Sequence, residues 1–462
     1  MAIVKYNGEL GIFKYDDTEF QEWTTHENKE YLKYIGKETD GSKIKIPEGV
    51  IDCDSMFCGC TNLETAPIIP EGVVYCNNMF YQCTNLKTAP AIPEGVEDCN
   101  SMFEDCINLK IAPVILEGVM YCESMFSGCK SLETAPVIPE GVLYCKNMFD
   151  GCTNLKTSPP TIPEGVIDCG YMFYDCESLK TAPAIPEGVE DCRYMFSGCL
   201  KLETAPVIPE GVIDCSCMFS GCINLKTVPV IPEGVANCGG MFCGCKSLKT
   251  APTIPKGVIY CDYMFQNCIN LETAPIISEG VTNCKSMFED CRSLKTAPAI
   301  SKGVEICDSM FKDCESLKTA PVIPEGVEDC AYMFAGCTNL ETAPIIPESV
   351  EFGYNMFEGC KNLKTASMVP KRIKHCEDMF SGCENLKTAP IISEGVLYCD
   401  NMFNSCKSLE TVPIIPNSIV SYSSMFKDCI NLKTVPKISK DIYYDFMFEN
   451  CRSLKKIKTI RI

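Results

Sequence analysis

Cysteine is the residue type with the greatest chemical capacity in this chain, which has 36 cysteines among 462 residues. Thiols at this density can build a disulfide framework or hold metal ions. Most of them fall into two columns of a repeated unit, seven residues apart, as at Cys53 and Cys60. Only Cys58, Cys217 and Cys243 stand outside the columns. The placement of the two columns therefore decides what chemistry the thiols can perform.

Three interpretations of the cysteine columns remain open. Seven residues span about 10 Å along a helix, which is too far for a disulfide inside one unit. Equivalent residues of stacked units lie about 4.8 Å apart, so disulfides between units stay an alternative, as does bound metal. No C-x-x-C zinc pairing occurs, and Gly353 and Tyr422 replace cysteine in the first column. We therefore favour small, buried, reduced thiols.

Other catalytic constellations are missing from the sequence. The two histidines, His26 and His375, lie far apart, and no serine or cysteine nucleophile recurs beside a histidine. There is no glycine-rich phosphate loop. An enzyme needs one unique pocket, whereas this chain repeats one unit. We predict that it is not an enzyme, and we predict no cofactor and no metal site.

The unit that positions these residues is marked by a Met-Phe pair that occurs eighteen times, from Met56 to Met447. Fifteen of the seventeen intervals are 23 residues long; one has an additional proline at Pro159-Pro160, and the last is one residue shorter. The consensus is V-x-x-C-x-x-M-F-x-x-C-x-x-L-(K/E)-T-A-P-x-I-P-E-G. Such short units bury an apolar face only by stacking on their neighbours.

Two local patterns lie within the unit. Apolar residues spaced i, i+3, i+4 and i+7 predict one face of a short helix, as in Val50, Cys53, Met56, Phe57, Cys60 and Leu63. Residues 63–66 predict a short strand that Pro67 ends, and residues 70–73 predict a turn. The predicted fold is an α/β repeat solenoid of stacked coils, each with a short strand, a turn and a short helix.

The repeats also suggest three segments. Residues 1–42 do not fit the unit, and an Asn7-Gly8 turn predicts a hairpin there. We interpret this segment as an N-terminal cap or, alternatively, an attachment module. Residues 43–452 form the eighteen-repeat solenoid, and residues 453–462 predict a C-terminal capping strand.

Composition limits the classes of partner. The formal net charge of −20 disfavours nucleic acid and anionic membrane surfaces. Prolines interrupt every apolar run, so we predict no membrane insertion. The first residues lack a basic segment followed by an apolar core, and we infer no secretory signal. The compartment stays open between the cytoplasm, unconventional export and a virion.

The sequence LKTAPAIPEGVEDCNSMFEDC resembles the BspA-like class of leucine-rich repeats, which has a 23-residue unit. The shared positions include Leu86, Ile92-Pro93, Val96, Phe103 and Cys106. Met before Phe and an extra proline depart from that class. The resemblance covers roughly residues 43–460. It implies a leucine-rich-repeat fold and a non-catalytic interaction solenoid, and it transfers no catalytic residue.

Three polar columns are the candidate binding surface. A charged column alternates Glu-Lys-Lys, a threonine column follows it, and a column of turn glutamates runs through the first half of the chain. The candidate residues are Glu71, Glu94, Glu117, Glu140, Glu164, Glu187, Glu210, Glu233, Lys87, Lys110, Lys156, Lys180, Thr88, Thr134, Thr157 and Thr181. A solvated edge is the alternative to a docking edge for a basic partner or divalent cations.

The function that these observations favour is protein interaction or adhesion, with a protein or glycan bound through many shallow, repeated contacts. One alternative is a structural component of a surface or phage fibre, oligomerising through residues 1–42. A second alternative is a thiol-rich metal-binding protein.

Overall fold

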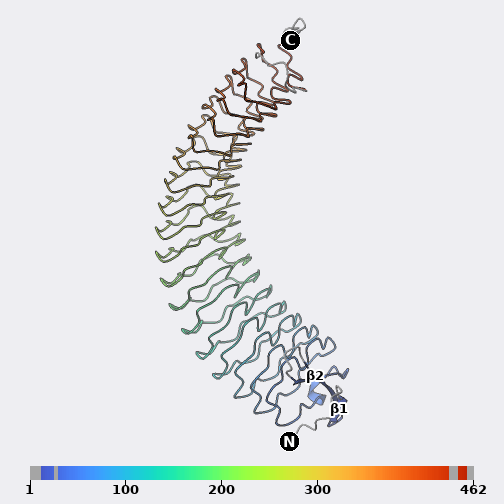
Figure 1. Cartoon of the computed structure of the whole chain (residues 1–462). Helices are drawn as coiled ribbons and strands as arrows, with labels where there is room; N and C mark the ends of the chain where they lie inside the picture. Colours follow the sequence, from blue (N-terminus) through green and yellow to red (C-terminus); the bar gives the residue numbers. More distant parts are fainter. Residues whose placement is uncertain (1–11, 25–29, 436–445, 455–462) are drawn as a thin grey trace. The chain divides into compact units, whose positions relative to one another are not determined.

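The chain stacks its repeats as successive coils (Figure 1). The computed structural model describes residues 12–24, 30–435 and 446–454. The coils fall into two compact units, Met1–Pro232 and Glu233–Ile462. Within each unit, every coil contacts the coils before and after it, which is the architecture predicted from the 23-residue period.

Two ladders of parallel bridges join consecutive coils. The first runs through the threonine column, for example Thr65 with Thr88. Here the predicted strand is reduced to one bridged residue, because the proline two positions later has no N–H to continue the ladder. The second ladder precedes the first cysteine column, for example Tyr121 with Tyr144, and was not predicted.

A run of β-turns replaces the short helix predicted in each coil. The N–H of Met125 bonds to the carbonyl of Cys122, and that of Cys129 bonds to Phe126, each three residues back. The N–H of Phe126, which lies between these two turns, donates to the carbonyl of Met148 in the next coil at 2.9 Å. A helix would keep these donors inside one segment, four residues apart. The helix prediction is therefore wrong for the described coils, where the only helix is the 3-10 helix η1 (Gly41–Lys43).

Positive φ angles make these turns possible. Ser124, before the Met, has a φ of 54°, and Gly128, two positions after the Phe, has a φ of 71°. Asp105 and Asp175 occupy the position of Gly128 in other coils and also have positive φ. Gly and Asp tolerate this region better than most residues. The turns thus place on the inside the same positions that a helix would have buried.

The core consists of apolar columns that run through the coils. In each described interior coil the Met, the Phe and the Leu are fully buried, as at Met102, Phe103 and Leu109. Consecutive Phe rings within each unit stack nearly parallel, with centroids between 5.4 Å (Phe57 to Phe80) and 5.8 Å (Phe196 to Phe219) apart. Repeating one side chain at one position therefore builds a continuous aromatic stack.

A three-stranded antiparallel sheet precedes the first coil (Figure 1). Its strands are β1 (Ile12–Tyr15), β2 (Thr18–Thr24) and β3 (Glu30–Tyr34), in the order β1-β2-β3. Asp16 and Asp17 form the β1–β2 turn with φ of 44° and 64°, as a two-residue hairpin with primed geometry requires. The hairpin predicted at Asn7-Gly8 lies outside the described residues.

The sheet covers the first coil. Tyr34, at the end of β3, lies 5.3 Å from Phe57, measured between ring centroids, and its N–H donates to Met56. Phe20 of β2 packs edge-on against Tyr34 on the other side. Tyr34 thus occupies the place that a preceding Phe takes in the later coils of the same unit. Residues 455–462, which hold most of the predicted C-terminal strand, lie outside the described residues.

Candidate functional site

The turn glutamates lie where the sequence predicted a turn. In the turn that ends at Val142, the N–H of Val142 bonds to the carbonyl of Pro139 at 3.1 Å. Glu140 is the first of the two central residues of this turn, and its side chain points to solvent. The other predicted turn glutamates are exposed too: Glu71, Glu94, Glu117, Glu164, Glu187, Glu210 and Glu233. Among the described residues, no salt bridge neutralises these carboxylates. Seven of these eight glutamates lie in unit Met1–Pro232, which therefore has an exposed acidic edge, and Glu233 is the first residue of the second unit.

The charged column forms regular ion pairs. Each Glu binds the Lys of the coil that follows it, as Glu133 Oε2 binds Lys156 Nζ at 2.6 Å. The same pairing joins Glu64 to Lys87, Glu203 to Lys226, Glu272 to Lys295, Glu341 to Lys364 and Glu410 to Lys433. The partner Lys156 lowers the pKa of Glu133. These exposed pairs set register rather than supply much stability.

The remaining predicted surface residues are exposed as well. Lys87, Lys110, Lys156 and Lys180 point to solvent beside the exposed residues Thr88, Thr134, Thr157 and Thr181. The backbone of the threonine column is occupied by the bridge ladder, for example Thr134 with Thr157. Neither the charged nor the threonine column lines either of the two depressions described below.

The sequence interpretation missed a fourth exposed column. It consists of the residue x that directly follows the first proline of A-P-x-I-P. We call it the aliphatic column, because it holds Ile or Val in most coils. Ile68 is 82% exposed and Val207 is 85% exposed, whereas the following Ile69 is buried. The available signal was the strand period of two, since neighbouring residues of an extended segment face opposite sides. The other exposed Ile and Val members include Val114, Val137, Val230, Ile276, Val322, Ile345, Ile391 and Ile414.

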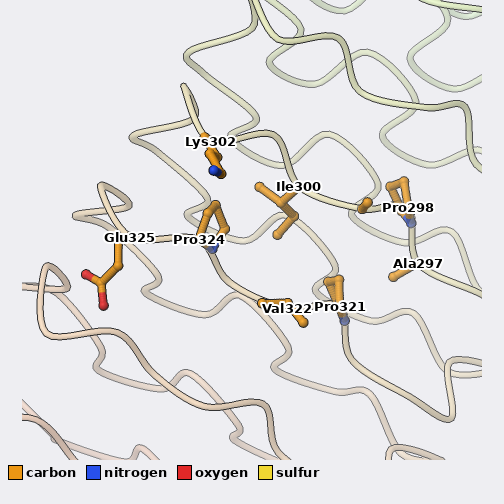
Figure 2. Close-up of a pocket in the computed structure, with 9 residues that line it drawn as sticks. Ala297, Pro298, Ile300, Lys302, Pro321, Val322, Pro324 and Glu325 are labelled. Atoms are coloured by element: carbon orange, nitrogen blue, oxygen red, sulfur yellow. The ribbon is translucent and has the colours of Figure 1, made fainter.

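Alanine in the aliphatic column leaves a notch between larger neighbours. Ala91 lies between Ile68 and Val114 along the column, and the depression there has a volume of about 600 Å³. A second notch of about 690 Å³ surrounds Ala299. Figure 2 shows the second notch, with Val322 and Pro321 on one side and Ile300 and Pro298 on the other.

The notches bring the aliphatic column and the turn charges together. Glu71 and Glu94 line the Ala91 notch, and Lys302 and Glu325 line the Ala299 notch. The two depressions therefore share an apolar base of proline and aliphatic side chains but differ in charge. The first is acidic, and the second carries one charge of each sign.

The cysteines lie away from this surface. None of the 36 forms a disulfide, and nearly all those in the two columns are buried. Burial raises the pKa of Cys106 to about 12, so this thiol stays protonated and unreactive at neutral pH. The Sγ of Cys106 donates to the backbone oxygen of Phe80 at 3.2 Å. Within the described part of the chain, no group of three or more His, Cys, Asp or Glu side chains is arranged to hold a metal ion.

Within the ranges that the structure describes, there is no helix that could cross a lipid bilayer.

Comparison with known families identifies the class of protein. The BspA type leucine rich repeat region matches residues 30–133, 120–214, 192–318 and 329–455, which together make up most of the chain. The chain therefore belongs to the BspA-type leucine-rich repeat family, as the repeated unit predicted. The stacked coils, the Leu column and the Ile-Pro turns are the features that place it there.

The first of three similar solved structures shows the same fold. A leucine-rich repeat protein from Bacteroides ovatus is 22% identical, with a TM-score of 0.53, and the match covers 82% of this chain and 99% of that one. A leucine rich cell surface protein from Faecalibacterium prausnitzii is 21% identical over 94% of this chain and 96% of that one, with a TM-score of 0.29. A leucine-rich repeat protein from Eubacterium ventriosum is 17% identical over 92% and 94%, with a TM-score of 0.34. No curated protein sequence matches the chain significantly.

Proposed function

We propose that this protein is a non-catalytic binding solenoid that holds a protein ligand along its aliphatic column and turn-glutamate edge. The observation that carries the proposal is the exposure of Ile and Val side chains at one position of the coils, including neighbouring coils such as those of Val114 and Val137 or Val322 and Ile345. Soluble proteins rarely leave such a contiguous apolar surface uncovered unless it binds something. Repetition multiplies weak single contacts, because each further coil engages a ligand that is already held.

The chemistry of the surface favours a polypeptide over a glycan. The aliphatic column and its flanking prolines present apolar surface, for example at Ile68 and Pro67, and this suits the side chains of a protein ligand. The threonine column would suit a glycan better, but its main chain is engaged in the bridge ladder. Thiol-based metal binding is disfavoured, because burial raises the pKa of the column thiols.

Residues 1–42 act in this proposal as a cap rather than an attachment module. The contact of Tyr34 with Phe57 and that of Phe20 with Tyr34 support this role, because the two rings cover the end of the aromatic stack. Solenoids need such terminal covers to keep their first coil from water.

Selection from a random peptide library on the immobilised full-length chain tests the proposal. The decisive variant combines Ile68→Asp, Val114→Asp and Val137→Asp, all at exposed positions of the aliphatic column. A matched control combines Ile51→Asp, Ile167→Asp and Ile213→Asp, which are also exposed but lie in a different column. We expect the selected peptides to bind the wild type and the control but not the triple variant of the aliphatic column. Equal binding to all three proteins, or selection of no peptide, would overturn the proposal.

A further inference from the structure

The Ala91 notch differs from the rest of the aliphatic column in shape. Ala91 lies between Ile68 and Val114, and its single methyl group leaves a depression where both of these neighbours present a branched side chain. Leu116 also lines this notch, at a position where most coils have proline. The notch therefore has room for one aliphatic side chain of a ligand.

The walls of the Ala91 notch are rigid. Pro67, Pro90 and Pro93 line it, and all three are buried. The proline ring fixes φ, so these walls have little conformational freedom to lose on binding. A site that is already formed in the free protein binds more tightly than one that must be ordered by its ligand.

The charge of the Ala91 notch selects a cation. Glu71 and Glu94 line it from consecutive coils, whose bridged chains lie about 4.8 Å apart. Neither carboxylate has a salt-bridge partner among the described residues, so both are available to a ligand. A lysine or arginine of the ligand can reach both carboxylates together. The Ala299 notch has no such preference, since Lys302 offsets Glu325.

The main chain of Ala91 is also available. Ala91 is exposed, and neither its N–H nor its C=O takes part in the hydrogen bonds of the described coils. By contrast, the N–H of Lys87, earlier in the same coil, donates to Glu64 at 2.9 Å. Free main-chain groups beside side-chain pockets are what an extended peptide uses when it binds alongside another chain.

We propose that the Ala91 notch is the anchor point for an extended, basic segment of a protein ligand, with an aliphatic side chain in the notch and a neighbouring lysine or arginine on Glu71 and Glu94. This inference rests on the proposed binding function and names its ligand class. It assigns the acidic edge of unit Met1–Pro232 a part in recognition rather than in solvation alone.

Fluorescence anisotropy with a labelled short peptide of alternating lysine and leucine tests this assignment on the full-length chain. Ala91→Ile fills the notch with a residue that the column already tolerates at Ile68. We expect it to weaken binding about tenfold, as the loss of an interface anchor does. The matched control, Ala299→Ile, fills the other notch and leaves the dissociation constant within about twofold. Equal weakening by both substitutions, or by neither, would show that the Ala91 notch is not the anchor.

A second pair of variants tests the charge. We expect Glu71→Gln with Glu94→Gln to weaken binding of the same peptide about tenfold at low salt and less at high salt, where charges are screened. Glu325→Gln serves as the control and leaves binding unchanged. A glutamate-leucine peptide that binds as well as the lysine-leucine peptide would refute the cation preference. If library-selected peptides depend on the aliphatic column but not on Ala91, the binding solenoid stands and this anchor fails.

Discussion

The Sγ of Cys83 lies 3.1 Å from the backbone oxygen of Phe57 in the preceding coil and donates a hydrogen bond to it. The same oxygen accepts the N–H of Cys60 at 3.0 Å, so both of its lone pairs are used. The pattern recurs in the second cysteine column within each unit, for example from Cys129 to Phe103. The column therefore links coils through hydrogen bonds, in addition to filling the core.

Loss of one such thiol destabilises the stack. We expect Cys129→Ala to lower the free energy of unfolding by about 1–3 kcal/mol, because it removes a buried hydrogen bond and leaves a small cavity. The urea midpoint measured under reducing conditions reports the change. Cys58→Ala is the control, since Cys58 is partly exposed and lies outside both columns, and its effect stays below about 0.5 kcal/mol. An equal effect of the two substitutions would show that the hydrogen bond contributes nothing specific.

Stability falls at alkaline pH because of the same columns. Burial raises the pKa of Cys106 and Cys222 to about 12, from an ordinary value of 9.0. Between these values the unfolded thiols ionise and the folded ones do not, so the unfolded state is favoured as the pH rises. Each such thiol contributes a slope of about 1.4 kcal/mol per pH unit. Urea midpoints in reductant should be level from pH 7 to 8 and fall from 9 to 10; a midpoint that stays level through pH 10 contradicts this.

The partly buried carboxylate of Asp150 makes stability depend on pH in the acidic range as well. Burial, together with Asp175 and Glu104, raises the pKa of Asp150 to about 6 from 3.8. The folded state thus binds this proton more tightly than the unfolded state, and the stability it contributes is lost as the pH rises from about 4 to 6. We expect Asp150→Asn to stabilise the protein at pH 7 by about 1 kcal/mol, a modest value because the side chain is partly exposed.

The pH dependence of that variant is its own control. The gain from Asp150→Asn should vanish at pH 4, where the wild-type side chain is protonated in the folded state. Urea midpoints at the two pH values give the comparison. A gain of the same size at both would attribute the effect to something other than ionisation.

Two glycines separate the effect of backbone conformation from that of crowding. Gly59 and Gly128 occupy the same turn position with φ of 74° and 71°. A Cβ on Gly59 meets nothing within 4 Å, whereas one on Gly128 would clash with Oδ1 of Asp105. We expect Gly59→Ala to destabilise by about 1 kcal/mol through φ alone and Gly128→Ala by more. Thermal or urea unfolding of the two variants gives the comparison, and the prediction fails if Gly59→Ala is the worse.

The cap makes a local contribution to stability. Tyr34→Ala removes a buried ring from the end of the aromatic stack, and we expect a loss of about 3–5 kcal/mol in the first coils. Tyr34→Phe keeps the ring and loses only the hydroxyl that accepts the N–H of Glu38, so its effect is about 1 kcal/mol. Hydrogen exchange resolved along the chain should show faster opening near Phe57 and little change near Phe380. Uniform loss of protection throughout would show that the cap does not act locally.

The sequence predicted the burial of the coil positions correctly but not their conformation. Cys122, Met125, Phe126 and Cys129 are all buried, as the spacing indicated. A helix and a run of β-turns bury the same positions, so the spacing of apolar residues cannot distinguish the two conformations. The neighbouring coil favours the β-turns over a helix, because the carbonyl of Met148 in that coil accepts the N–H of Phe126.

The candidate site was predicted only in part. The exposed turn glutamates followed from Pro-Glu-Gly, and Glu140 lies where that motif placed it. The aliphatic column was overlooked, because Ile68 and Ile69 are equally apolar. The two side chains point to opposite sides of the extended segment, so that Ile68 is exposed and Ile69 is buried. The notch at Ala91 needs three coils, since its neighbours on the column belong to the coils before and after it.

The sequence by itself determined the repeat, its register, the family and the set of buried columns, because these depend on which residue types recur every 23 positions. The tertiary structure alone decided three features. These are the β-turn conformation, the pairing of each Glu with the Lys of the following coil, and the position of the turn charges beside the apolar notches. Each of these depends on a hydrogen bond or a neighbour supplied by another coil. A residue's own unit does not contain that partner, and stacking brings it within reach.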